Sequence, residues 1–412
     1  MHSTSTIYAG LPLVFKQVRR LNLDRIIENI GIRNRKIPPA KLALLIVALK
    51  IVGITRLSHI HQIGDFLISS LLGFEALPDQ STVNRFLGKI NRTQAQKLFS
   101  LATEEMIKSG KVEGKVLAAD VHVIPYYGEK QPLATKTYCA TKNRAIPGFK
   151  LICIYDVKSG FMLAYRFLPG NADCKKVLTR MLSGVISLLP RVKSRYILID
   201  KGFHDKKVFA KLKETRIYFV IPAKRYASIR HSLFALSDDL KDDLVFGSNV
   251  VETVYQPKGS KLKLRLIFKF FPKEKGGGDG LFDFLTNDDR VKAESLLKLY
   301  SKRWRLENAF AELKNDFFID KLPSSSFEKI NAHIALTLIA YNLSILVKSC
   351  LKKLAKVRMS TLRRVLIKIQ AAIKIAAGLV YVDAVFKEHL PKGRIRCGPL
   401  AAIPHLSEVI YC

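Results

Sequence analysis

Acidic side chains are scarce in this sequence. Its 412 residues include 34 Asp and Glu against 69 Lys and Arg, which leaves a formal net charge of +35. Such an imbalance makes an anionic polymer the expected partner. Nucleic acid is the first candidate, and an anionic membrane surface is the second. Because 48% of the residues are hydrophobic, a disordered basic tail is excluded and a folded core is expected.

Cysteine and histidine patterns that hold metals or disulfides are absent. The six cysteines form no C-x-x-C pair and no dense framework. None of the nine histidines has zinc-site spacing, since His59 and His61 lie two residues apart and do not share a helix face. The N-terminus has no signal-peptide pattern. A reducing, cytoplasmic location is therefore expected.

Long uncharged runs are also scarce. The longest extends over the 18 residues from Ile330 to Val347. That length would allow a membrane span. The run, however, contains the polar residues Asn331, His333 and Asn342, which favour a helix buried inside the protein. We therefore expect no membrane association.

The order of strand and helix patterns in the sequence predicts an α/β fold that is divided into several segments. Between Val116 and Pro222, the order of patterns is three strands, a helix, a strand, a helix and a strand. An acidic patch (Asp238–Asp243) and a Gly-rich loop (Gly276–Gly278) mark a later β-rich stretch. The expected segments are a helical N-terminal DNA-binding domain (1–112), the first part of an α/β core (113–223), a β-rich insertion (224–285), the second part of the core (286–345) and a basic, helical C-terminal region (346–412).

Two cationic features outside the core are candidates for nucleic-acid contact. A helix is expected to start at Asp79 or Ser81, and its first turn would hold Gln80, Thr82, Asn84 and Arg85. Such residues read DNA from a recognition helix, although a plain surface helix has the same pattern. The stretch from Lys348 to Lys374 has nine Lys or Arg and no acid, so it is either a phosphate track or a solvated face.

Three acids stand out by their context. Asp120 interrupts an apolar strand, Asp200 ends another directly before a Gly turn, and Glu307 lies in a helical pattern. A carboxylate in a strand core is costly unless it is paired, hydrogen-bonded or bound to metal. Converging carboxylates suit hard divalent cations, which can support phosphodiester cleavage. For either Asp alone, a strand-end cap or a salt bridge is the simpler interpretation.

The pattern around Glu307 strengthens the hypothesis of a site. One long helix is expected from Asp289 to Asp320. At about 100° per residue, Tyr300, Arg303, Glu307 and Lys314 would fall within about 60° of one another on that helix. An Arg and a Lys beside a metal-binding carboxylate would clamp phosphates. The alternative is a surface stripe with an ordinary Arg303–Glu307 pair.

These residues resemble a known family. Tyr300, Arg303, Glu307 and Lys314 match the Y-(2)-R-(3)-E-(6)-K signature of the insertion-sequence-four group of DDE transposases. The stretch Asp200-Lys201-Gly202-Phe203 is similar to the D-x-G-[FY] motif around the second Asp of that group, and Ala119-Asp120 is similar to the first. Gaps of 79 and 106 residues separate the three acids, and the longer gap contains the β-rich insertion.

The resemblance implies an RNase H-like core whose catalytic triad, Asp120, Asp200 and Glu307, binds Mg²⁺, with Mn²⁺ as a substitute. It also implies that Tyr300, Arg303 and Lys314 contact transposon-end DNA. The reaction would be cut-and-paste transposition: hydrolysis at the terminal inverted repeats of double-stranded DNA, and then attack of the 3′-OH on target DNA. Cutting two ends together implies a homodimer. The alternatives are a catalytically silent, transposase-derived DNA-binding protein and a structure-specific nuclease.

Two residues near these motifs have simpler expected roles. His122 stands two residues after Asp120, where the family often has a small hydroxyl residue. We expect it to be a packed residue or one that supports the metal ligands. Trp304, the only tryptophan, is expected to anchor its helix rather than to stack on a base.

Overall fold

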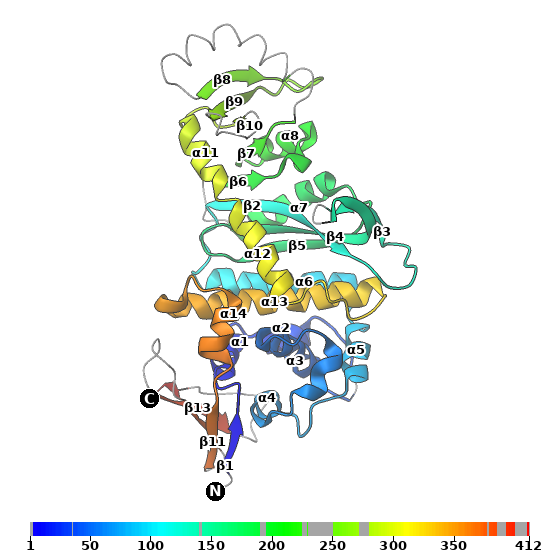
Figure 1. Cartoon of the computed structure of the whole chain (residues 1–412), viewed down its shortest axis with the longest axis vertical. Coiled ribbons are helices and arrows are strands. Elements are labelled where there is room, and N and C mark those ends of the chain that lie inside the picture. The colour runs from blue at the N-terminus through cyan, green and yellow to red at the C-terminus, as the bar shows by residue number, and fades with distance from the viewer. Residues whose placement is uncertain are drawn as a thin grey trace.

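The computed structural model describes residues 3–34, 36–139, 142–189, 195–224, 229, 250–271, 280–376, 379–384, 393–399 and 410–411. Figure 1 shows an elongated molecule with the N-terminal helices towards one end, a sheet in the middle and antiparallel strands at the other end. One cluster of buried apolar side chains extends from Tyr8 to Val382, so these parts share a core. The acidic patch and the Gly-rich loop lie outside the described residues.

The N-terminal part is helical, as predicted. Its elements are α1 (Leu11–Arg20), α2 (Leu23–Asn29), α3 (Pro39–Val52), the 3-10 helix η1 (Leu57–Gln62), α4 (Phe66–Leu72), α5 (Gln80–Leu87) and α6 (Arg92–Lys108). Helix α3 has a proline at its first position, where no N–H is needed. It is apolar and buried on nearly all sides, because the other helices surround it. Helix α6 begins with a capping box between Asn91 and Gln94.

A nine-stranded mixed sheet extends from the middle of the molecule to one of its ends (Figure 1). Its strands are β2 (Val116–Pro125), β3 (Thr135–Cys139), β4 (Arg144–Asp156), β5 (Met162–Pro169), β6 (Tyr196–Ile199), β7 (Tyr218–Pro222), β8 (Val250–Tyr255), β9 (Leu264–Phe271) and β10 (Gly280–Thr286). Their order is β3-β4-β2-β6-β7-β10-β9-β8, and β5 pairs with β4. Strands β2, β6 and β7 are parallel to one another, and the other pairs are antiparallel.

The predicted α/β character is confirmed. Helix α7 (Cys174–Leu188) connects β5 to β6, and α8 (Lys206–Glu214) connects β6 to β7, in the predicted succession. Strand β3 is an addition that the sequence did not predict. The helices begin where an aspartate accepts a backbone hydrogen bond, Asp173 from Lys175 and Asp205 from Lys207.

Helix α13 (Phe327–Cys350) passes through the centre of the molecule. It packs against α3 on one side and against β5 on the other, and Figure 1 shows it beside α6, as a layer below the sheet. It is long and apolar enough for a membrane span, but 94% of its most apolar window is buried inside the protein. The side chain of Asn342 exchanges two hydrogen bonds with the backbone of Met162, at 2.9 and 2.8 Å. The predicted buried helix is confirmed.

The C-terminal region differs from the prediction. Beyond η4 (Lys352–Leu354), α14 (Met359–Leu362) and the π-helix η5 (Arg363–Ile367), the chain forms β11 (Ala371–Ala376), β12 (Leu379–Ala384), β13 (Gly393–Pro399) and β14 (Ile410–Tyr411). These strands and β1 (Ser3–Thr6) make an antiparallel five-stranded sheet. The prediction of a wholly helical C-terminal region was therefore wrong. Its Ile, Val and Tyr residues suit strands once β1, from the far end of the chain, offers an edge to pair with.

Candidate active site

Two of the three predicted carboxylates come from neighbouring parallel strands. The register of β2 and β6 pairs Ala119 with Ile199, so Asp120 and Asp200 are the next residue on each strand. Asp200 directly follows β6 and caps a short 3-10 helix, η3 (Lys201–Phe203). Adjacent strands lie about 4.8 Å apart. The two carboxylates are therefore neighbours at the carboxyl end of β6, close enough for the charge of Asp200 to act on Asp120.

The third carboxylate comes from helix α12 (Trp304–Asn315), which crosses β2 (Figure 1). Glu307 lies in the first turn of α12. One turn further on, the ring of Phe310 stacks on that of His122, with ring centroids 5.2 Å apart. This contact holds α12 against the strand that carries Asp120. As a result, the charge of Glu307 also acts on Asp120.

The single long helix predicted from Asp289 to Asp320 is wrong. The structure has two helices, α11 (Ala293–Ser301) and α12, and the N–H groups of Lys302 and Arg303 bond to carbonyls three residues earlier. A short 3-10 turn of this kind changes the helix direction without interrupting the sequence pattern. Tyr300 therefore lies at the end of α11, and the four signature residues do not share one helix face. The Arg303 guanidinium nevertheless lies 5.7 Å from the Tyr300 ring.

Arg303 joins two of the acids. Its Nη1 donates to Oδ2 of Asp120 at 2.9 Å, and its Nη2 donates to Oε1 of Glu307. The side chains of Arg303 and Asp120 are 15% and 20% exposed, so this pair is largely shielded from solvent. The contact with Asp120 links residues 183 positions apart in the sequence. The cationic group that balances the acids in this structure therefore comes from the protein itself.

Burial sets the protonation of Asp120. Removal from solvent is the main cause that raises the pKa of this carboxyl to about 6, and the charges of Asp200 and Glu307 raise it further. The backbone N–H of Val121 and the Arg303 guanidinium oppose the rise. Asp120 is repelled by the negative charges of Asp200 and Glu307, and a bound cation would relieve this repulsion. The site therefore attracts positive charge.

Tyr300 faces the same site. Its burial raises the pKa of the phenol well above the usual value, and the charges of Asp200 and Asp120 act in the same direction, while Arg303 opposes them. The hydroxyl therefore stays protonated at neutral pH and can donate a hydrogen bond.

His122 and Lys314 lie further along the same interface. Burial lowers the pKa of His122 to about 4, and the Lys314 charge lowers it further, so the imidazole is neutral at pH 7. Its Nε2 has no hydrogen-bond partner among the described residues. The structure thus places His122 as a packing residue between β2 and α12. Lys314, in the last turn of α12, is exposed.

Two neighbours on α12 differ from the sequence analysis. Trp304 is 56% exposed, so the prediction that it anchors the helix was wrong. A large apolar side chain in a helical pattern usually packs, but the turn before α12 directs this one outward. Arg305, which the sequence did not single out, donates to the carbonyl of Val157 at 3.0 Å and ties α12 to the turn after β4. The only indication of this role in the sequence is that Arg305 is a basic residue within the signature.

The donor set suits a hard divalent cation. Asp120, Asp200 and Glu307 supply carboxylate oxygens from two strands and a helix, the ligand type that Mg²⁺ prefers. Among the described residues, however, no three His, Cys, Asp or Glu side chains lie close enough together to hold an ion. The guanidinium of Arg303 stands between two of the acids instead. The residues fit the metal in chemistry, provided that Arg303 gives up these contacts.

The chain matches one protein family over more than half of its length. The Transposase DDE domain covers residues 112–343, a range that includes the three acids and also Tyr300, Arg303 and Lys314. Comparison with curated proteins gave no significant match.

Three solved structures match this chain at low similarity. A piggyBac transposase synaptic complex with hairpin DNA has a TM-score of 0.48 and 12% identity, covering 88% of this chain and 81% of that chain. The Mos1 strand transfer complex has a TM-score of 0.20 and 16% identity, covering 52% and 67%. A Mos1 paired-end complex with the left transposon end has a TM-score of 0.19 and 16% identity, covering 52% and 73%. TM-scores this low do not establish a shared fold. The family match does not depend on them, and the chain belongs to the Transposase DDE domain family.

Proposed function

We propose that this protein is the transposase of an insertion sequence and moves its element by cut-and-paste. The family implies DNA cleavage and strand transfer. The single observation that carries the finer proposal is that Asp120 and Asp200 end neighbouring parallel strands, while Arg303 bonds to both Asp120 and Glu307. In the proposed reaction, hydrolysis at the element ends exposes a 3′-OH, which then attacks the target strand.

The architecture supports a more precise assignment. Within the central sheet, strands β5, β4, β2, β6 and β7 lie in that order, with β2, β6 and β7 parallel. We propose that this is an RNase H-like core and that the chain belongs to the insertion-sequence-four group, whose signature residues are Tyr300, Arg303, Glu307 and Lys314.

The metal is proposed to be Mg²⁺, with Mn²⁺ as a substitute, held by Asp120, Asp200 and Glu307. The chemistry supplied by a divalent cation at such a site is activation of the attacking oxygen and stabilisation of the leaving oxygen. Arg303 balances the acids before the site is loaded, and its guanidinium then becomes available for a phosphate of the bound strand. Tyr300 stays protonated and donates to DNA rather than attacking it.

The remaining DNA contacts are proposed from position and charge. Lys314 is exposed at the end of α12 and can reach the backbone of the element end. Helix α5 has Gln80 and Arg85 exposed on its surface, so we propose it as a reader of terminal-repeat DNA. Paired ends would require a homodimer, and the expected location is the cytoplasm, on the nucleoid.

The test is cleavage of a labelled duplex that carries the end of the element. The full-length protein should cut at the element boundary with Mg²⁺ and not with EDTA, and Asp200→Ala or Glu307→Ala should abolish cutting while DNA binding persists. Asp173→Asn is the matched control, because it removes a carboxylate that only caps α7 and leaves a good cap in its place. Binding without any cutting would indicate the silent DNA-binding protein. Cuts scattered over any duplex would indicate a nuclease, and retained cutting in Glu307→Ala would refute the triad.

A further inference from the structure

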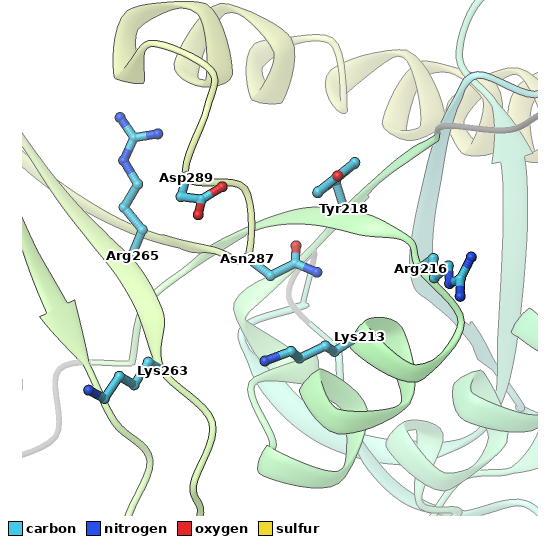
Figure 2. A pocket seen from close by; sticks show the side chains of 7 residues that line it. All are labelled: Lys213, Arg216, Tyr218, Lys263, Arg265, Asn287 and Asp289. Carbon is cyan, nitrogen blue, oxygen red and sulfur yellow. The ribbon is translucent and has the colours of Figure 1, made fainter.

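A cavity of about 430 Å³ lies beside the start of β7, the start of β9 and the loop after β10. Figure 2 shows the side chains that surround it. Lys213 and Arg216 come from the end of α8 and the turn before β7, Lys263 and Arg265 from the start of β9, and Asn287 and Asp289 from the loop after β10. We call this cavity the far-edge pocket. Three separate parts of the chain therefore contribute to one hollow.

The lining of the far-edge pocket has more positive than negative charge. It contains four cationic side chains and one carboxylate. Lys213, Arg216 and Lys263 are exposed and have no ion-pair partner among the described residues. The fourth cation, Arg265, is already paired with Glu252, and its charge also acts on Asp289. Three cations thus remain to bind an anion.

The backbone at Arg216 is unusual. This residue has a φ of +55°, in the left-handed region that glycine or asparagine normally occupies at the end of a helix. The bonds from Arg216 N to Lys213 O and from Ile217 N to Leu212 O, at 3.0 and 2.9 Å, form the closing motif of α8. An arginine there costs about 1–2 kcal/mol relative to glycine. Arg216 is thus a strained residue at the margin of the pocket, and strained residues are often found at ligand sites.

The floor of the pocket is rigid. The amide of Asn287 accepts from Phe219 N and donates to Ile217 O, both at 2.9 Å, so it fastens the loop after β10 to β7. Arg265 donates to the carbonyls of Asp288 and Val291, which fixes the opposite side. The cations therefore project from a fixed frame rather than from loose loops.

The far-edge pocket lies away from the catalytic acids. Tyr218, which lines it, begins β7 and pairs with Tyr196 of the parallel strand β6. Asp200 lies four residues beyond Tyr196, which is about 13 Å along the strand. One phosphate cannot touch both places. A distance of about 13 Å corresponds to about four base pairs along a duplex.

We propose that the far-edge pocket binds backbone phosphates of double-stranded DNA, at least about four base pairs from the phosphate that reacts. This inference rests on the proposed function, because it takes DNA as the substrate. It adds a second place of contact, near the amino-terminal ends of β6 and β7, whereas Asp200 lies at the carboxyl end of β6. Backbone recognition requires only unpaired cations on a rigid frame, which are the features of this pocket.

The test measures DNA affinity at several salt concentrations, with EDTA present and in the Asp200→Ala background. The pocket variant carries Lys213→Ala and Lys263→Ala. The control, Lys97→Ala with Lys111→Ala, removes the same charge from two exposed lysines on and after α6. Each phosphate contact contributes about 0.9 to the slope of log affinity against log salt. We therefore expect a slope shallower by about 1.8 and an affinity about 60-fold lower at 0.1 M salt in the pocket variant only. Equal slopes in both variants would overturn the proposal.

A second variant separates binding from folding. Arg216→Gly removes one contact and also relieves the left-handed strain, so the melting temperature should stay the same or rise while affinity falls about 8-fold at 0.1 M salt. Replacing Lys213 and Lys263 by arginine should preserve the slope. An Arg216→Gly protein with wild-type affinity would refute the proposal, and so would a loss of slope in the arginine variant.

Two DNA probes identify the source of the phosphates. If the pocket variant loses affinity equally for element-end DNA and for an unrelated duplex, the pocket contacts any DNA backbone. If it loses affinity for element-end DNA alone, the pocket contacts the element end. Because these measurements need no cleavage, they can fail while the transposase assay succeeds. Equally, they can succeed with a protein that does not cut.

Discussion

Arg303→Gln should make this protein bind divalent metal more tightly. Arg303 donates to Asp120 at 2.9 Å and also to Glu307, so an ion that takes both carboxylates as ligands has to displace it. Glutamine keeps hydrogen-bonding capacity but has no charge. In the variant, the ion therefore enters a site where no protein cation competes with it.

The size of the effect follows from the burial of the pair. Two charges 4 Å apart interact by about 4 kcal/mol at an effective dielectric constant of 20. The side chains of Arg303 and Asp120 are 15% and 20% exposed, so solvent screens them weakly, but desolvation offsets part of the attraction. A hydrogen bond to a charged group contributes about 1.5–3 kcal/mol to stability. That range corresponds to about 10- to 150-fold in metal affinity.

The assay is titration calorimetry with Mn²⁺ at pH 7.5 on the full chain without DNA. Arg305→Gln is the matched control. It removes the same charge two residues along α12, and Arg305 donates to a carbonyl and forms no ion pair among the described residues. Cleavage should fall in Arg303→Gln as metal affinity rises, because the proposed phosphate contact is lost. Metal affinity equal to or below that of the wild type would refute this reasoning.

Substitutions at three further positions test the core. Lys50 is 1% exposed, and burial lowers its pKa from 10.5 to about 7. Because the folded pKa is lowered, stability is fully present above pH 10.5 and is lost as pH falls towards 7. Lys50→Met should therefore stabilise the protein by up to about 5 kcal/mol at pH 6.5 and by much less at pH 10, and an equal gain in urea unfolding at both pH values would contradict this. Asn342→Leu should cost about 2–5 kcal/mol by the same assay, because it leaves two buried backbone groups of Met162 without partners. His122→Ala should lower the melting temperature through loss of packing on Phe310, whereas His122→Phe should preserve it. Equal melting temperatures for these two variants would show that the ring contact contributes nothing.

The central α/β elements could be predicted because their signals are local. A short apolar run such as Arg195–Asp200, followed by a Gly turn, favours a strand by its own residues, and an aspartate before a helical pattern favours a helix cap. The break between α11 and α12 could not be predicted, because the apolar spacing continues across Lys302 and Arg303. The C-terminal strands depended on β1, which pairs with β11 from more than 350 residues away. No sequence pattern within residues 371–384 indicates that β1 is the partner strand.

The candidate site, like the fold, could be predicted from the sequence only in part. The residue types and spacing of Asp120, Asp200 and Glu307 were readable, because a carboxylate in an apolar strand stands out in one dimension. That Arg303 would face Asp120 depended on α12 crossing β2, a matter of packing between distant segments. The exposure of Trp304 also depended on that geometry.

By itself, the sequence determined the positive charge, the order of the core elements and the positions of the acids that we propose as the site. These follow from composition and from contacts within a few residues. The tertiary structure alone decided which cation balances those acids and that Lys213 and Lys263, 50 residues apart, face one pocket. Such contacts require two elements to be fixed relative to each other, and the free energy that fixes them comes from a core shared by the whole chain.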